Sequence, residues 1–141
     1  MSRAMSLSWL LLVVLLLGGC SLVLPVRSYP PLGVVTRIEV KDRRNGNPVR
    51  VIDDPAAVKR VVEFVDGQER GWGGQADWAG VPIPQVSAYF YNGSEFLGHF
   101  GVGSGFFECQ RVGDFSSKSC STAHERLFLE LIGLPGYELR K

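Results

Sequence analysis

The chain has 141 residues, a formal net charge of +1 at pH 7 and 45% hydrophobic residues. This length fits one domain with a modest hydrophobic core. The most basic stretch, residues 41–44, includes an acid, so no patch has the charge density that nucleic-acid binding requires, and we expect no nucleic-acid partner.

The N-terminal segment has the three parts of a secretory signal peptide. Arg3 supplies a positive charge, residues 7–17 are almost wholly apolar, and Gly18 and Gly19 are small enough for a peptidase groove. A retained transmembrane anchor is one alternative, but the apolar run is shorter than the ~20 residues that a membrane-spanning helix needs. A plain secretory signal that is cleaved elsewhere is the other alternative, and Cys20 argues against it.

The tetrapeptide Leu17-Gly18-Gly19-Cys20 resembles the lipobox of bacterial lipoprotein precursors. The resemblance implies that residues 1–19 are removed as a signal peptide and that Cys20 carries the lipid anchor. Two or more acyl chains on this cysteine would attach the chain stably to a membrane. Because Ser21 rather than aspartate follows, the sorting rule of enteric bacteria implies the outer membrane, with the inner membrane as the alternative. The remainder is similar only to small lipoproteins of Gram-negative bacteria, and that similarity assigns no chemistry to any residue.

Beyond the anchor, residues 20–32 contain three prolines and are expected to form a lipidated tether. Residues 33–141 are expected to form a single periplasmic domain. The apolar periodicity and the turn signals within it predict the element order ββαββββα. The predicted strands are residues 34–40, 49–52, 86–91, 96–102, 106–112 and 116–120.

Two helices complete the predicted domain. Asp54 and Pro55 form a helix start, and Thr122 with Glu125 has the spacing of a capping box. This order predicts an α+β fold, in which an antiparallel sheet of about five or six strands carries both helices on one face.

Cys109 and Cys120 are the two cysteines that remain once Cys20 is lipidated. Outside the cytoplasm, an even number of remaining cysteines predicts a disulfide. A symmetric hairpin centred between Asp114 and Phe115 would place the two thiols opposite each other. A metal site completed by the two histidines of the chain is the alternative, but the spacing lacks the close ligand pairs of zinc sites. We therefore expect a Cys109–Cys120 disulfide and neither a metal nor another cofactor.

Trp72 and Trp78 lie in a long glycine-rich segment, residues 66–84, that shows no periodicity. Long irregular loops in compact domains are often functional, and tryptophan is typical of binding hot spots. This segment is therefore the candidate binding loop. The alternative is that at least one indole packs back against the domain, because large aromatic side chains are mostly buried.

The residue types of a hydrolytic triad, Ser104, His99 and Asp114, occur without any local motif that supports one. The glycines around Ser104 lack the spacing of a nucleotide-binding loop or of a nucleophile elbow. Strand alternation predicts that His99 faces solvent, and His124 lies in the first turn of the last helix. The sequence therefore predicts that the chain is not an enzyme.

Two functions fit these observations. The first is an accessory lipoprotein whose domain binds another protein of the cell envelope. The second is a domain that binds a lipid or a peptidoglycan fragment through four aromatic residues of the sheet, Tyr89, Tyr91, Phe106 and Phe107. A hydrolase is the third alternative.

Overall fold

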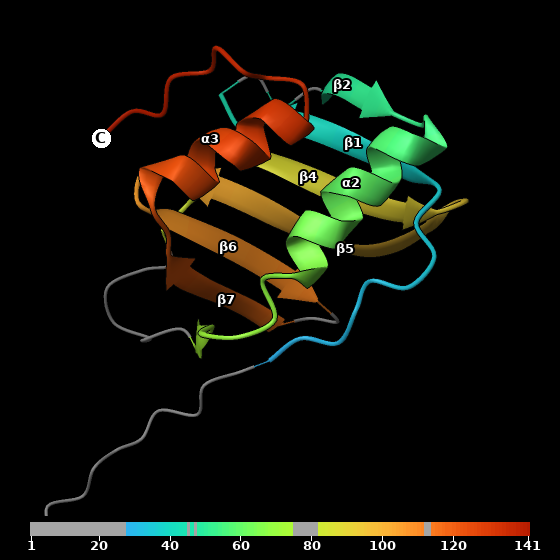
Figure 1. Cartoon of the computed structure of the whole chain (residues 1–141), viewed down its shortest axis with the longest axis horizontal. Coiled ribbons are helices and arrows are strands. Elements are labelled where there is room, and N and C mark those ends of the chain that lie inside the picture. The colour runs from blue at the N-terminus through green and yellow to red at the C-terminus, as the bar shows by residue number, and fades with distance from the viewer. Residues whose placement is uncertain (1–27, 45, 47, 75–81, 112–113) are drawn as a thin grey trace, which may run out of the picture.

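A computed structural model describes residues 28–44, 46, 48–74, 82–111 and 114–141. The predicted signal peptide and Cys20 lie outside these residues. The described part of the chain forms two helices and seven strands (Figure 1). In chain order they are β1 (Arg37–Asp42), β2 (Pro48–Ile52), α2 (Pro55–Asp66), β3 (Gly73–Gly74), β4 (Val86–Asn92), β5 (Glu95–Gly103), β6 (Phe106–Arg111), β7 (Asp114–Ser119) and α3 (Thr122–Leu131).

The strands form one antiparallel sheet in the order β2-β1-β4-β5-β6-β7-β3. The predicted α+β class, an antiparallel sheet with two helices, is confirmed. The structure adds β3, whose two residues pair with Ser116 and Ser117 of β7. No strand was predicted there, because two glycines give no alternation of apolar and polar side chains.

An aromatic cluster joins both helices to the centre of the sheet. The ring of Phe64 on α2 lies 6.2 Å from Phe100 and 5.9 Å from Phe107, measured between centroids. Phe128 on α3 lies 5.0 Å and 6.0 Å from the same two rings. Phe64 and Phe128 also stack on each other, with ring centroids 5.6 Å apart. Phe100 and Phe107 therefore mark the side of the sheet that holds the hydrophobic core.

The start of α2 is as predicted. The side chain of Asp54 accepts a hydrogen bond from the Ala57 N–H at 2.8 Å, and Pro55 occupies the first turn. Proline has no N–H, and the first turn of a helix has no intrahelical acceptor for one. The buried side chains of the helix follow at helical spacing: Val58, Val61 and Val65.

The predicted capping box at the start of α3 is not formed. Ser121, not Thr122, is the N-cap, and its hydroxyl accepts from the His124 N–H at 3.3 Å. Glu125 is buried and instead accepts a hydrogen bond from the Gly105 N–H at 2.5 Å. The carboxylate thus ties α3 to the turn between β5 and β6, because that backbone N–H needs an acceptor.

The described end of the predicted tether is packed against the domain. Leu32 is buried, and its N–H donates to the Asp66 carboxylate at 3.0 Å. The guanidinium of Arg111 donates to the Pro30 carbonyl at 3.3 Å. Residues 28–32, which we expected to belong to the tether, are therefore part of the domain.

The C-terminal segment is fastened at two points. The Tyr137 hydroxyl donates to Asp42 at 3.1 Å, and Arg44 donates to the same carboxylate through Nε and Nη2. The hydrogen bonds from Arg44 hold the pKa of Asp42 below its usual value. Further along, the side-chain amide of Gln85 donates to the Arg140 carbonyl at 2.7 Å and accepts from the Arg140 N–H at 2.8 Å.

Candidate functional site

The candidate site is the face of the sheet that points away from the aromatic core, which we call the outer face. Side chains alternate along a strand. His99 and Glu108, the sequence neighbours of Phe100 and Phe107, therefore lie on the outer face. The strand registers place these further side chains beside them: Arg37, Glu39, Lys41, Ser87, Tyr89, Tyr91, Phe96, Gln110 and Phe115.

A continuous row of rings crosses the outer face, and we call it the aromatic row. Its members, in order, are Tyr91, Phe96, Tyr89, His99 and Phe115. Neighbouring ring centroids lie 5.7, 6.1, 5.2 and 5.8 Å apart along this order. Offset and tilted contacts at such distances are favourable for aromatic pairs. Phe96, in the row, is 47% exposed, so the row presents an apolar surface to its surroundings.

Two cations lie over the tyrosine rings of the row. The Arg37 guanidinium carbon lies 4.7 Å from the centroid of Tyr91, and Lys41 Nζ lies 4.4 Å from the centroid of Tyr89. Glu39, between them on β1, is 3.1 Å from Arg37 and 3.5 Å from Lys41. Cation–π contacts and ion pairs together hold these long side chains in place. This edge of the aromatic row is therefore charged as well as aromatic.

A β-bulge brings Phe96 into the aromatic row. Tyr91 pairs with Phe96, whereas Phe90 pairs with Gly98, so Leu97 is the extra residue on β5. Gly98 has φ +143°, and a Cβ there would meet the Gln110 carbonyl, so only glycine fits. The extra residue changes the alternation, and Phe96 and His99 consequently share one face although they are three positions apart.

His99 and Glu108 form a buried pair on the outer face. His99 Nε2 lies 2.7 Å from Glu108 Oε1, and the two side chains are 4% and 1% exposed. Strand alternation placed His99 on the correct face, but the expectation that it meets solvent is wrong. The rings of Tyr89 and Phe115, on either side of the imidazole, help to bury it.

Ser87 lies near this pair, but the three residues do not form a catalytic triad. Ser87 is opposite Gly101 on β5, and Gly101 is opposite Glu108 on β6. Ser87 Oγ and His99 Nδ1 are buried and make no hydrogen bond with any described residue. A catalytic serine needs a hydrogen bond to its base and access to a substrate. The described contacts therefore join His99 to Glu108 and leave Ser87 outside the pair.

The structure also separates the triad that could be assembled from the sequence. Ser104 lies in the turn between β5 and β6, whereas Asp114 begins β7 opposite Arg111, at the other end of β6. The six residues of β6 span on the order of 20 Å. His99, in β5, is hydrogen-bonded to Glu108 instead of to Ser104 or Asp114.

Trp72 belongs to the core, which confirms the alternative that at least one indole packs back against the domain and removes this residue from the candidate binding loop. Its side chain is 2% exposed, and the indole N–H donates to the Gln68 carbonyl at 2.5 Å. The ring makes an edge contact with Phe100 at 5.8 Å, and Lys118 Nζ lies 5.0 Å from its centroid. Burying so large an apolar surface stabilises the fold more than exposing it. Trp78 lies outside the described residues.

The four aromatic residues considered for ligand binding do not share a surface. Phe107 is buried in the core, and the others lie on the outer face: Tyr89, Tyr91 and Phe106. The Phe106 ring occupies the space that a Cβ of Gly103 would need, so it folds over β5. Phe96 was not among the predicted binding residues, because no pattern in the sequence marks the bulge that turns it outward.

The predicted disulfide is absent, and both cysteines are free thiols. Cys109 is opposite Ser116, so Cys120 is displaced by four residues along the chain, about 13 Å in an extended strand. A disulfide needs Cα atoms within about 7 Å. The error lies in the turn, which we centred between Asp114 and Phe115, whereas the observed pairs centre the hairpin two residues earlier.

We expect both thiols to react with iodoacetamide only when the protein unfolds. Burial, and then the Glu125 carboxylate, raises the pKa of Cys120 to about 11, and burial also raises the pKa of Cys109. At pH 8 about one Cys120 in a thousand is then a thiolate. Mass spectrometry after alkylation in denaturant, without reductant, should find both residues modified, and Cys120→Ser is the control. A pair that stays unmodified until reductant is added would contradict the free thiols.

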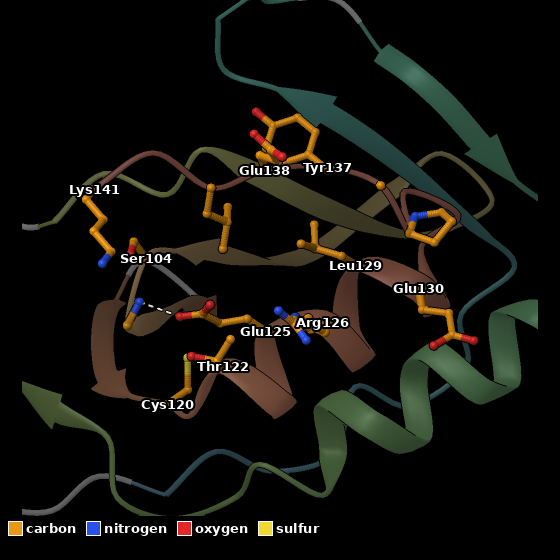
Figure 2. Close-up of a pocket in the computed structure, with 14 residues that line it drawn as sticks. Ser104, Cys120, Thr122, Glu125, Arg126, Leu129, Glu130, Tyr137, Glu138 and Lys141 are labelled. Atoms are coloured by element: carbon orange, nitrogen blue, oxygen red, sulfur yellow. Dashed lines mark hydrogen bonds between the residues drawn. The ribbon is translucent and has the colours of Figure 1, made fainter.

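A second surface feature is a cleft of about 820 Å³ between α3, the β5–β6 turn and the C-terminal segment (Figure 2). Figure 2 shows Glu125 pointing across it to the turn next to Ser104. Charges of both signs line the cleft: Arg126 and Lys141 with Glu130 and Glu138. The described lining includes Ser104 but no histidine that could act as its base.

Neither helix in the described part of the chain is long and apolar enough to cross a membrane. No three His, Cys, Asp or Glu side chains of the described residues are grouped so that they could hold a metal ion. Comparisons with protein-family models, curated proteins and solved structures found no match.

Proposed function

We propose that this chain is a bacterial lipoprotein, anchored through Cys20 in the outer membrane, whose periplasmic domain binds another envelope protein without catalysis. The lipobox-like tetrapeptide supports the anchor. We further propose that both helices cover one face of the sheet, which leaves the outer face for the partner. Exposed Phe96, between Tyr91 and Tyr89 in a charged aromatic surface, is the observation that carries the proposal.

The residue types of the outer face are those of protein interfaces. Tyrosine, phenylalanine and arginine are enriched in such interfaces, and tyrosine and arginine are also enriched among their hot spots. The faces of Tyr89 and Tyr91 are already occupied by Lys41 and Arg37. A sugar ring would have to displace these cations in order to stack, whereas a protein can pack around them. The arrangement therefore favours a protein over a peptidoglycan fragment at this face.

Photo-crosslinking in intact cells tests the proposal. With p-benzoylphenylalanine at position 96, we expect one abundant envelope protein to be crosslinked. With the same probe at Leu127, an exposed residue of α3, we expect that protein to be absent. Phe96→Ser should weaken the interaction about 30-fold, as expected for a hot spot, with little change in stability because the ring is exposed. Labelling with palmitate, lost in Cys20→Ser, tests the anchor in the same cells.

If a partner is crosslinked equally at both positions, or if no partner is crosslinked at position 96 of a folded, membrane-attached chain, the outer face is not the interface.

The second candidate function is a small-ligand domain, and the cleft favours it because its volume lies in the range of ligand pockets. A probe at Glu130 in the cleft distinguishes the two functions. It would give adducts of lipid or muropeptide mass if the cleft binds a ligand of that class.

A further inference from the structure

Strand β2 lies at one edge of the sheet (Figure 1) and, among the described residues, is paired only with β1. Arg43, directly after the end of β1, donates its N–H to the Gln85 carbonyl, toward β4. Backbone groups of successive residues point to opposite sides of a strand. Ile38 and Val40 therefore direct their N–H and C=O groups toward β2.

The backbone of Val51 consequently faces the open edge. Ile38 and Val40 pair with Ile52 and Arg50, whose backbone groups point back to β1. Val51 lies between these two residues, so its N–H and C=O point away from the sheet. Unpaired groups of this kind are a template for another strand.

The side chains of β2 leave this edge accessible. Val49 and Val51 are 45% and 50% exposed, although valine is usually buried. Val51 is opposite Glu39, which in turn is opposite Tyr89. The Val51 side chain therefore lies on the outer face, beside Glu39. A strand added to β2 would widen the proposed interface by one strand.

The charges around β2 select the partner. Lys41, Arg43, Arg44 and Arg50 lie in or near the β1–β2 hairpin, where Asp42 pairs with Arg44, and Asp53 and Asp54 follow the end of β2, so Arg50 is the charge within the strand itself. Two copies of β2 that paired antiparallel about Arg50 would place like charges opposite each other, which is unfavourable. A strand with a carboxylate opposite Arg50 would instead be attracted.

We propose that β2 binds an extended segment of the partner by strand addition, with an acidic residue opposite Arg50 and an apolar residue opposite Val51. This inference rests on the proposed function, because it describes how the same partner extends across the edge of the outer face. Main-chain hydrogen bonds would supply affinity, and alternate side chains would supply specificity.

The test uses the full lipidated chain in detergent and a fluorescein-labelled seven-residue peptide of alternating valine and glutamate. We expect saturable binding by fluorescence anisotropy and slower hydrogen exchange at the Val51 N–H. Val51→Pro removes the outward donor without removing a bond to β1, and should weaken binding about tenfold. Val51→Thr keeps the donor and is the matched control.

Charge reversal gives an independent readout. Arg50→Glu should weaken binding of the glutamate peptide about tenfold and strengthen binding of the same peptide with lysine in place of glutamate. A glutamate peptide whose backbone N–H groups facing β2 are N-methylated cannot donate hydrogen bonds to the strand and should not bind. This peptide keeps the test decisive if Val51→Pro fails to fold. Equal binding by wild type and Arg50→Glu, or binding of the N-methylated peptide, would overturn strand addition.

The two proposals fail in different ways. Phe96→Ser leaves β2 intact, so peptide binding should be unchanged while binding of the partner captured at position 96 is weakened. Peptide binding that fails while position 96 still captures a partner would overturn strand addition and leave the proposed function in place. Peptide binding without a partner at position 96 would overturn the proposed function alone.

Discussion

Replacing Trp72 with alanine is expected to lower the free energy of unfolding by about 3–5 kcal/mol, the largest effect of any substitution considered for this chain. The indole is 2% exposed and contacts Phe100 in the core. Its removal leaves a cavity and also leaves the Gln68 carbonyl without the hydrogen bond from the indole N–H. The free energy of unfolding of a small domain is only slightly larger than this loss, so a large part of the variant population should unfold.

Urea unfolding followed by far-ultraviolet circular dichroism measures this effect. Phe96→Ala removes an aromatic ring of similar chemistry from the exposed outer face and serves as the control, with an expected change below about 1 kcal/mol. Trp72→Phe keeps most of the packing and loses the N–H, so it should fall between the two. A stable Trp72→Ala variant would contradict the buried position of the indole.

Replacing Glu108 with leucine is expected to destabilise the domain by about 3 kcal/mol. His99 Nδ1 already has no partner among the described residues, and the substitution removes the acceptor at Nε2 as well. The imidazole would then be a buried polar ring without a described partner. Glu108→Gln keeps an oxygen at the same place and should be milder.

The double variant His99→Leu/Glu108→Leu distinguishes a broken pair from a lost side chain. If the unpaired imidazole causes the destabilisation, the double variant should be more stable than Glu108→Leu alone. Gln110→Leu, on the same strand and face, is the control and should have little effect. A double variant whose loss equals the sum of the two single losses would show that the residues are energetically independent. Thermal or urea unfolding of the variants measures the coupling.

The candidate site was only partly visible in the sequence. Tyr89 and Tyr91 were predicted to be aromatic residues of the sheet, and because they are two positions apart on one strand they share a face. Phe96 was missed because one inserted residue, Leu97, changes which face the rest of the strand presents. Such a bulge is specified by close contacts across the sheet, at Gly98 and the Gln110 carbonyl, and not by a local pattern. The partnership of His99 with Glu108 depends on the same register.

By itself the sequence determined the α+β class and the start of α2. These features depend on spacing and capping within a few residues, and the interactions that produce them are local. Only the tertiary structure decided the burial of Trp72, the register that keeps Cys109 and Cys120 apart, and the composition of the outer face. Each of these depends on which distant segments meet, and a one-residue change of register reverses every side chain of a strand. Local patterns therefore predicted the elements, whereas contacts between distant residues determined the surface on which we place the function.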